Sequence, residues 1–475
     1  SILQVISLIS SSSIYWYDLE TFGKNPQRDR VCQFAGVRTD ENLNIIGDPL
    51  VIFCSPSDDF LPSPFACLIT GITPQKALAK GVNEFEFTRK INQEFSMPNT
   101  CVVGYNNIKF DDEFMRRLLY RNLFDPYERE YKNQNSRWDI IDMVRLCAAV
   151  RPEGIEWPRT KTGRKSFRLD QLTGANGIEH DDAHDALADV IATIEMAKLI
   201  KVKQPKLFEY VFNLRDKNKV RAIASKTDKP ILHIATKYSS QRGYLGLVLP
   251  ICEHPTIRNR FVFYNLSHDP NNWIGLEAEE VKEQIQSKNP FGVISASSCP
   301  ILVTPKILTE SVIREYGLDL DSCLENARSI RESPTIEMTI SKIFSEKVVE
   351  KESDPDLMIY QGFFDKNDKG LMETVRNTKP EDLGRLDLPF HDHRLEELFF
   401  RYRARNFRGT LSSNETIRWD RYRNDKFKND NLFQQFESDM KEAALHVKKT
   451  KIKNGSRILT ELEEYADQIR DSLKP

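Results

Sequence analysis

The acidic residues with the clearest chemical potential are Asp18 and Glu20, in the run Asp18-Leu19-Glu20-Thr21 that ends an apolar stretch. If that stretch is a β-strand, residues two apart project from the same face, about 6–7 Å from each other. Two carboxylates in that arrangement could share a divalent metal ion. Taken alone, the pattern is more often a pair of solvated acids at the end of a strand.

Further acids and a histidine occur in two later segments. Asp111 follows a polar loop and opens a predicted helix, where helix capping and the helix dipole favour a carboxylate in any case. His184 and Asp189 lie five residues apart at the start of a long predicted helix, so they project about 140° apart and could approach one phosphate from two directions. The dipole favours a neutral histidine in the first turn, which suits a general base. A lone surface histidine is nevertheless commoner than a catalytic one.

The elements that must position these residues alternate between strands and helices. Hydrophobic patterning and turn residues predict a meander of three strands at 14–19, 31–38 and 44–53. After a proline-rich loop we expect a strand at 101–103 and helices near 84–95, 110–122, 137–149 and 167–174. A helix at 182–201, with Asp182 as its N-cap, closes this region. Its apolar face carries Leu187, Val190, Ile191 and Ile194. This mixture predicts an α/β domain.

The length of 475 residues predicts two or three domains. We expect a ragged terminus at 1–13, the α/β domain at 14–201, a β-rich domain at 202–353 and an all-α domain at 354–475. Strand patterns in the β-rich domain lie at 231–236, 244–249, 261–266 and 301–303. An amphipathic helix at 458–473 ends the chain.

The composition narrows the class of protein. The net charge of −2 means that any nucleic acid must be held by local groups of Lys and Arg. The eight cysteines lie far apart without a C-x-x-C pair, which indicates reduced thiols in a cytoplasmic protein and not a zinc site or a disulfide framework. No run of 18 apolar residues predicts a membrane span, and the apolar start of the chain is too short to cross a bilayer and lacks a basic n-region.

In order and spacing, the combination of D-x-E, a helix-opening Asp and H-x4-D resembles the DEDDh family of 3′→5′ exonucleases, which have a ribonuclease H-like fold with a mixed sheet. The resemblance implies two Mg²⁺ ions, replaceable by Mn²⁺, held by Asp18, Glu20 and Asp189, with Asp18 bridging both and Asp111 bound mainly through water. His184 would take the proton from the attacking water. Carboxylates suit such hard ions, and two of them can stabilise both the attacking and the leaving oxygen. Asp181, Asp182 and Asp185 compete for the metal role, and only the family spacing selects Asp189.

Residues outside these motifs resemble the bacterial exonuclease I family, in the segments 133–139, 151–155, 166–169, 360–364 and 402–407. That resemblance implies an SH3-like second domain, a helical third domain and processive release of 5′-mononucleotides from single-stranded DNA with a free 3′ end, in DNA repair and recombination. It also implies a monomer that binds the acidic C-terminal tail of single-stranded DNA-binding protein. The alternatives are an exoribonuclease of the same class and a non-catalytic scaffold for single-stranded DNA.

The same resemblance implies contacts with the DNA strand. Arg116, Tyr127, Tyr131 and Arg145 match positions that face DNA, while Glu20 and Arg168 would meet the nucleotide being cut. Tyr127 and Tyr131 could equally be a packed aromatic pair on one helix. A later group consists of Arg401, Arg403, Arg405 and Arg408. It could grip phosphate, or it could pair with acids such as Glu396 and Glu397.

Two segments depart from the family. The residues before Ile14 lack its usual charged character. The loop 158–166 is unusually basic, which suggests an added phosphate contact. It superficially resembles a nucleotide-binding P-loop, but Pro158 stands where the first glycine belongs and Arg164 where the lysine belongs. We therefore exclude nucleotide hydrolysis.

Overall fold

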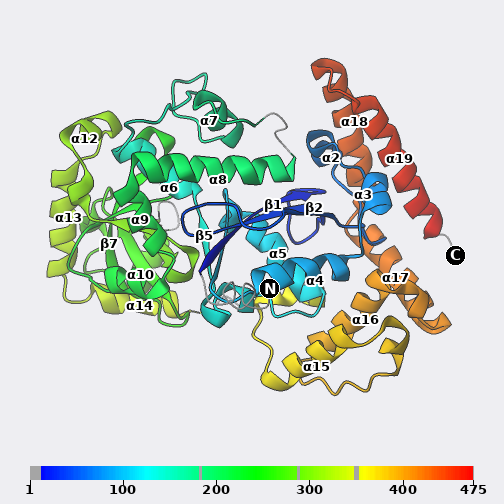
Figure 1. Ribbon diagram of the computed structural model, residues 1–475. Coiled ribbons are helices and arrows are strands. Elements are labelled where there is room, and N and C mark those ends of the chain that lie inside the picture. Colours follow the sequence, from blue (N-terminus) through cyan, green and yellow to red (C-terminus); the bar gives the residue numbers. More distant parts are fainter. Residues whose placement is uncertain (1–11, 181–184, 286–288, 347–351, 474–475) are drawn as a thin grey trace, which may run out of the picture.

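The computed structural model describes residues 12–180, 185–285, 289–346 and 352–473. Its first sheet lies at the centre of the molecule, with a second sheet on one flank and a helical region on the other (Figure 1). The first sheet has the order β3-β2-β1-β4-β5. Its strands are β1 (Ser13–Thr21), β2 (Val31–Thr39), β3 (Leu50–Phe53), β4 (Thr100–Gly104) and β5 (Ser136–Asp139). The neighbours of β1 are the antiparallel β2 and the parallel β4, so the sheet is mixed, as expected.

Three predicted boundaries in this sheet were wrong. Ser13, assigned to the ragged terminus, begins β1 and pairs with Thr100. The third strand begins at Leu50 and not at residue 44, because Gly47 adopts a left-handed conformation (φ 75°) and Pro49 has no N–H to donate to a ladder. Residues 137–139 were predicted to open a helix but form the edge strand β5, since pairing with β4 outweighs the local helical pattern.

Side chains along β1 alternate between two cores. Ile14 and Trp16 lie in the same core as Val190 and Ile194 of α8 (Ala186–Lys203). Tyr15, Tyr17 and Leu19 instead lie in a core built with α4 (Glu84–Phe95) and α5 (Asp111–Arg121). Helix α8 therefore lies on one side of the sheet, with α4 and α5 on the other (Figure 1).

Helix α8 begins later than predicted. The side chain of Asp185 accepts hydrogen bonds from the backbone N–H groups of Leu187 and Ala188, so Asp185 is the N-cap. Asp182, the predicted cap, lies outside the described residues. The other helices up to residue 224 are α2 (Pro64–Thr70), α3 (Pro74–Lys80), α6 (Ile141–Val150), α7 (Leu169–Ala175), α9 (Pro205–Asn213) and α10 (Lys217–Ala224).

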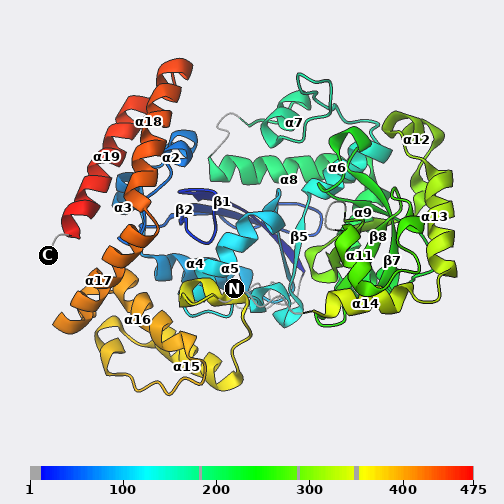
Figure 2. The same cartoon turned by 180° about the vertical axis from the view of Figure 1, so that it is seen from behind.

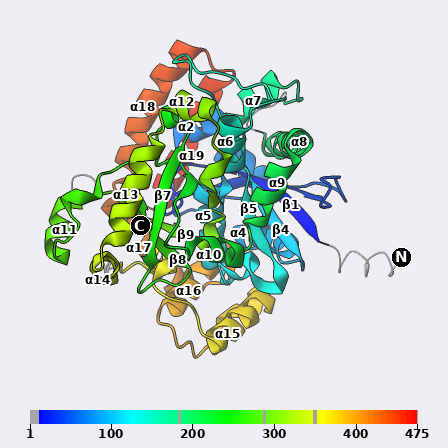
Figure 3. The same cartoon turned by 90° about the vertical axis from the view of Figure 1, so that its left-hand side faces the viewer.

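The second sheet is entirely antiparallel, with the order β10-β6-β7-β8-β9. Its strands are β6 (Ile231–Ile234), β7 (Leu245–Glu253), β8 (Arg260–Asn265), β9 (Phe291–Ser295) and β10 (Ile301–Val303). The sequence patterns located four of them and missed β9, which is short and contains Gly292. Figure 3 shows this flank of the molecule. Four helices lie beside the sheet there: α11 (Ala278–Ile285), α12 (Glu310–Tyr316), α13 (Leu320–Glu332) and α14 (Ile336–Ser345).

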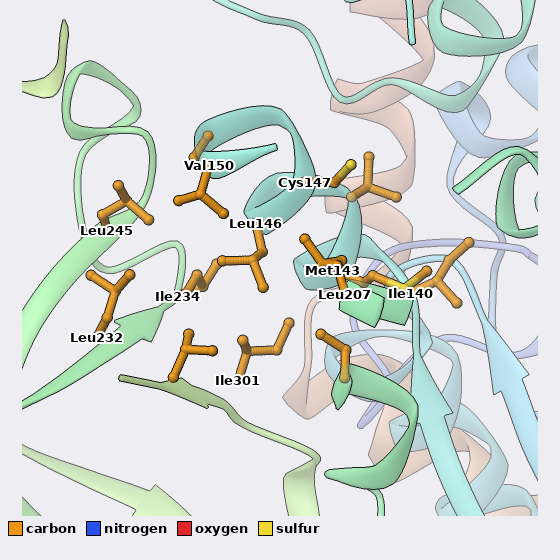
Figure 4. Close-up of a cluster of buried hydrophobic side chains, with 14 of the residues drawn as sticks. Ile140, Met143, Leu146, Cys147, Val150, Leu207, Leu232, Ile234, Leu245 and Ile301 are labelled. Carbon is orange, nitrogen blue, oxygen red and sulfur yellow. The ribbon is translucent and has the colours of Figure 1, made fainter. Parts of the chain in front are cut away.

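The first domain and the second sheet share one hydrophobic core. Figure 4 shows Met143 and Leu146 of α6 facing Ile234 of β6 and Ile301 of β10. All four side chains are buried in a single cluster. Burial of this apolar surface fixes the second sheet against the first domain.

Residues 352–473 form helices and connecting loops, which agrees with the predicted all-α region. The helices are α15 (Lys366–Asn377), α16 (Arg394–Asn406), α17 (Ser413–Asn429), α18 (Leu432–Thr450) and α19 (Gly455–Ser472). Helices α18 and α19 pack against α2, with α3 also contacting α19, so these two helices lie on the first domain (Figure 2). None of the described helices combines the length and the apolar character needed to span a bilayer.

Candidate active site

The two acids of the D-x-E motif share one face of β1. Ile14 and Trp16 pack toward α8, and the two-residue period continues their row through Asp18 and Glu20. The row thus changes from apolar to acidic where β1 reaches the start of α8. Glu20 is 8% exposed and Asp18 is half-buried, so neither is a solvated acid at a strand end.

The third acid comes from α8. Asp189 lies in the first turn of that helix. One carboxylate oxygen from each of Asp18, Glu20 and Asp189 lies within 4.8 Å of the other two. We call these three residues the acidic cluster. Three oxygen ligands at such a spacing fit a hard divalent cation such as Mg²⁺ or Mn²⁺.

Asp111 reaches this region through a tight loop after β4. A side chain in place of Gly104 would put its Cβ 2.9 Å from the backbone oxygen of Tyr17, so only glycine permits this approach to β1. The carboxylate of Asp139 accepts hydrogen bonds from the backbone N–H groups of Asn106 and Ile108, at 2.8 and 3.2 Å. The sequence prediction gave Asp139 no role. Its position at the end of β5, next to a polar loop, was the available signal.

The adjacent acids Asp111 and Asp112 have different environments. Asp112 is fully buried and accepts hydrogen bonds from Tyr17 at 2.6 Å and from Arg129 and Arg137 at 2.8 Å each. Burial opposes its ionisation, but the two guanidinium groups outweigh burial and hold the pKa of Asp112 below its usual range. Burial and the charge of Asp112 raise the pKa of Asp111. Asp112 therefore stabilises the fold. The charge of Asp111, in contrast, acts on the acidic cluster, where it raises the pKa of Asp18.

The acidic cluster holds more negative charge than its surroundings neutralise. Burial, followed by the charges of Asp18 and Asp189, raises the pKa of Glu20 to about 9. Burial and the charges of Asp111 and Asp189 raise the pKa of Asp18 well above its ordinary value. Crowded acids of this kind bind either protons or a cation.

A histidine that the sequence prediction overlooked contacts the cluster. His180 Nε2 lies 2.5 Å from Asp189 Oδ1, and its Nδ1 lies 3.0 Å from Thr173 Oγ1. The spacing of H-x4-D drew attention to His184 and away from His180. His184 and the competing acids Asp181 and Asp182 lie outside the described residues. Asp185, the third competitor, is engaged as the cap of α8.

Arg116, Tyr127 and Tyr131 lie around α5 and the segment after it. Arg116 forms a paired contact with Glu130, with N–O distances of 2.8 and 3.0 Å, and lies over the ring of Tyr127. Tyr127 packs edge-on against Phe363, and Tyr131 is 55% exposed. The alternative of a packed Tyr127–Tyr131 pair on one helix does not hold, because a short 3₁₀ turn, Glu128–Glu130, separates the two residues.

The structure places Arg145 and Arg168 apart from that group. Arg145 is 8% exposed, bonds to Asp142 at 2.6 Å and lies over the ring of Tyr244 from the second domain. Arg168 precedes α7, with 64% of its side chain exposed and an ion pair to Asp170 at 2.9 Å. The guanidinium of Arg145 also lies 6.0 Å from the ring centre of Phe167, the residue before Arg168, so these two predicted DNA contacts are on neighbouring parts of the chain.

The sequence left two roles open for the arginines of α16 and the turn after it, phosphate binding and pairing with acids. The structure shows them paired with acids. Arg401 contacts Glu397 and Asp356, Arg403 contacts Glu415, and Arg408 contacts Asp420. Arg405 bonds to Asp59 and Asp356. These ion pairs account for the positions of the four arginines, and Arg408 still has 40% of its side chain exposed.

A second group of potential metal ligands, Asp365, Asp368 and His391, lies in the helical region. Asp368 already accepts the backbone N–H groups of His391 and Asp392. Asp365 caps α15 through the N–H of Asp368. These hydrogen bonds explain why the three side chains lie close together without a metal ion.

Comparison with known proteins shows which family the chain resembles along its length. Three family profiles match in order: the exonuclease domain at residues 15–197, the exonuclease I SH3-like domain at 215–346 and the exonuclease I C-terminal domain at 353–469. Exodeoxyribonuclease I of Escherichia coli is 43% identical over 88% of this chain and 90% of its own length.

Solved structures give the same result. The structure of E. coli exonuclease I in complex with a dA16 oligonucleotide matches with a TM-score of 0.92 at 40% identity, covering 97% of this chain and all of that one. Exonuclease I from Methylocaldum szegediense matches with a TM-score of 0.91 at 44% identity, covering 96% of this chain and 99% of that one. The predicted order of a nuclease domain, an SH3-like domain and a helical domain is confirmed, while the boundaries after residues 201 and 353 stay predictions.

Proposed function

Because the chain belongs to the exodeoxyribonuclease I family, we propose that it hydrolyses single-stranded DNA from a free 3′ end, releasing 5′-mononucleotides processively. The observation that carries this proposal is the acidic cluster, in which oxygens of Asp18, Glu20 and Asp189 lie within 4.8 Å of one another. Phosphodiester hydrolysis needs concentrated positive charge at the scissile phosphate, and these acids fit the ions that supply it.

Asp18, Glu20 and Asp189 would hold two Mg²⁺ ions, and Asp111 would add its negative charge to the same site. The ions, when bound, neutralise the phosphate and favour hydroxide over water. His180 orients Asp189 through the contact at 2.5 Å. Asp139 holds the loop that presents Asp111. His184 is assigned to remove the proton from the attacking water. A zinc-bound complex of E. coli exonuclease I with single-stranded DNA is consistent with a divalent metal in this family.

Among the proposed DNA contacts, Glu20 and Arg168 meet the terminal nucleotide, while Arg116, Tyr127, Tyr131 and Arg145 contact the strand. Exposed aromatic rings such as Tyr131 can stack on bases without regard to sequence. Structures of the E. coli relative include complexes with oligonucleotides and one of single-stranded DNA-binding protein with exonuclease I. We extend the acidic tail of that protein to this chain as a partner. All eight cysteines are free thiols, which fits a reducing compartment such as the cytoplasm. We further propose a monomer that acts in DNA repair and recombination.

A digestion assay tests the proposal. Matched oligomers of single-stranded DNA, duplex DNA and RNA, labelled at either end, are incubated with the protein in Mg²⁺. We expect 5′-mononucleotides from single-stranded DNA and loss of their release in the double variant Asp18→Asn, Asp189→Asn. Faster digestion of RNA would support the exoribonuclease alternative. Tight binding of DNA without digestion would support the scaffold alternative and overturn the proposal.

A further inference from the structure

The basic loop at 158–166, which the proposed function leaves without a role, forms a hairpin. Arg159 and Lys165 pair across an antiparallel bridge, and Gly163 turns the chain with a φ of 78°. We call residues 158–166 the basic hairpin. It contains four cations, Arg159, Lys161, Arg164 and Lys165, and no acid. A hairpin is not the loop before a helix that a P-loop requires, so its charge needs another explanation.

The basic hairpin forms one wall of a cavity between the first and second domains. The cavity has a volume of about 150 Å³. Its other walls come from α6, the turn before β7 and the end of α12. The lining includes four cations, Arg145, Arg159, Arg164 and Lys165, against one carboxylate, Glu315. Arg145 is paired with Asp142 and Lys165 with Glu315, so Arg159 and Arg164 supply the excess positive charge that would attract an anion.

Two cations of the hairpin keep most of their hydrogen-bonding capacity. Arg164 donates to Ser240 Oγ at 2.9 Å, and Arg159 donates to the backbone oxygen of Gly163 at 2.7 Å. Among the residues that the structure describes, neither arginine forms an ion pair with a carboxylate. A guanidinium has five N–H donors, and its planar fork matches the oxygens of phosphate.

The buried wall of the cavity carries a further unsatisfied donor. Arg145 is 8% exposed, and its Nε has no hydrogen-bond partner among the described residues. Its guanidinium lies 5.0 Å from the ring centre of Tyr244. Tyr244 itself adopts a left-handed conformation, with a φ of 62°, which is costly for a non-glycine residue. Aromatic and cationic groups thus line the cavity together.

We propose that this cavity binds the phosphate group of a nucleotide, with Arg159 and Arg164 as its ligands and Arg145 behind them. The inference rests on the proposed function, since the phosphate comes either from the backbone of the bound strand or from the released 5′-mononucleotide. The lining by Arg145, Phe167 and Tyr244 favours a nucleotide over inorganic phosphate, because rings and guanidinium groups stack on bases.

The test compares the double variant Arg159→Gln, Arg164→Gln with a charge-matched control, Arg314→Gln, Arg328→Gln. The control arginines are exposed and lie outside the cavity. Binding of an oligothymidylate is measured in EDTA at several salt concentrations. The slope of log affinity against log salt should become shallower by about 0.7 for each phosphate of the single strand that the variant no longer neutralises. The control should keep the parent slope, and melting temperatures verify that both variants fold.

A second arm identifies the source of the phosphate. Thymidine 5′-monophosphate and inorganic phosphate are titrated by calorimetry into the cavity variant and into the control variant. A changed salt slope assigns the cavity to the strand, and loss of mononucleotide binding alone assigns it to the product. If the cavity variant matches the control in both arms, the inference is overturned. Because neither arm needs turnover, this result is distinct from a failure of the nuclease proposal.

Discussion

The carboxylate of Asp59 accepts a hydrogen bond from Arg405 at 2.9 Å, and the two side chains are 0% and 1% exposed. Asp59 lies in the loop before α2, and Arg405 lies near the end of α16. Arg30 and Lys426 donate to the same carboxylate, at 3.3 and 3.1 Å. One buried acid therefore joins the helical region to the first domain.

Replacing Asp59 by Asn should destabilise the protein by about 3–5 kcal/mol, because it leaves three cations around an uncharged group in a buried site. Urea unfolding measures the loss. Asp382→Asn is the control, since Asp382 pairs with Arg385 at the surface and should cost about 0.5 kcal/mol or less. Equal losses in the two variants would contradict a special role for Asp59.

The same site predicts the response to acid. Burial opposes ionisation of Asp59, but Arg405, Lys426 and Arg30 hold its pKa well below the ordinary value. Its contribution to stability is therefore complete above the unfolded pKa of about 4 and is lost as the pH falls toward the folded pKa. The parent should lose stability below about pH 4 more steeply than Asp59→Asn does. Parallel curves would count against this assignment.

Asp111 and Asp112 should separate activity from stability. Asp112→Asn should lower the free energy of unfolding by about 3–5 kcal/mol, because it removes the buried partner of Arg129 and leaves Arg137 with its longer ion pair to Glu130, at 3.3 Å. Asp111→Asn should keep or raise stability, since its carboxylate is buried among acids. It should slow digestion about 10- to 100-fold, the usual effect of a group that acts on a metal through water. Melting curves and digestion rates of both variants test these two roles. A stability loss confined to Asp111→Asn would refute the assignment.

Glu20 should make stability depend on pH and metal. Its folded pKa of about 9 lies above the unfolded value of about 4.3, so the folded state holds an extra proton between these limits. In EDTA, stability should therefore fall as the pH rises from 5 to 9. Glu20→Gln should remove much of that fall and exceed the parent by about 1–2 kcal/mol near pH 8. Added Mg²⁺ should stabilise the parent more than the variant. A parent melting temperature that rises with pH in EDTA would contradict this account.

His180 should control the metal requirement through Asp189. His180→Ala removes the ring nitrogen 2.5 Å from that carboxylate, and the Mg²⁺ concentration for half-maximal digestion should rise about 10- to 100-fold. His180→Gln, which keeps a donor, should recover part of the loss. Thr173→Val, which removes the hydroxyl at the other ring nitrogen, should have a smaller effect. An unchanged Mg²⁺ dependence in all three variants would exclude a positioning role.

Much of the fold followed from local patterns. The two-residue period placed Asp18 and Glu20 on one face of β1, and the first strands formed the expected meander. Errors arose where distant pairing decided the outcome. Residues 136–139 became β5 because β4 offered its free edge, which no local pattern reveals.

The candidate site likewise depends partly on local sequence patterns and partly on contacts between distant residues. The sequence by itself determined which residue types could do chemistry, because the strand period, helix caps and motif spacing act over a few neighbouring residues. Only the tertiary structure decided which acid serves which purpose. Asp111 and Asp112 are adjacent, but of these two acids it is Asp112 that accepts hydrogen bonds from Arg129 and Arg137. The sequence likewise left two roles open for the arginines of α16, and folding brought Asp59 and Asp356 to Arg405. Charge is neutralised by whatever lies within a few ångströms, and those partners come from distant parts of the chain.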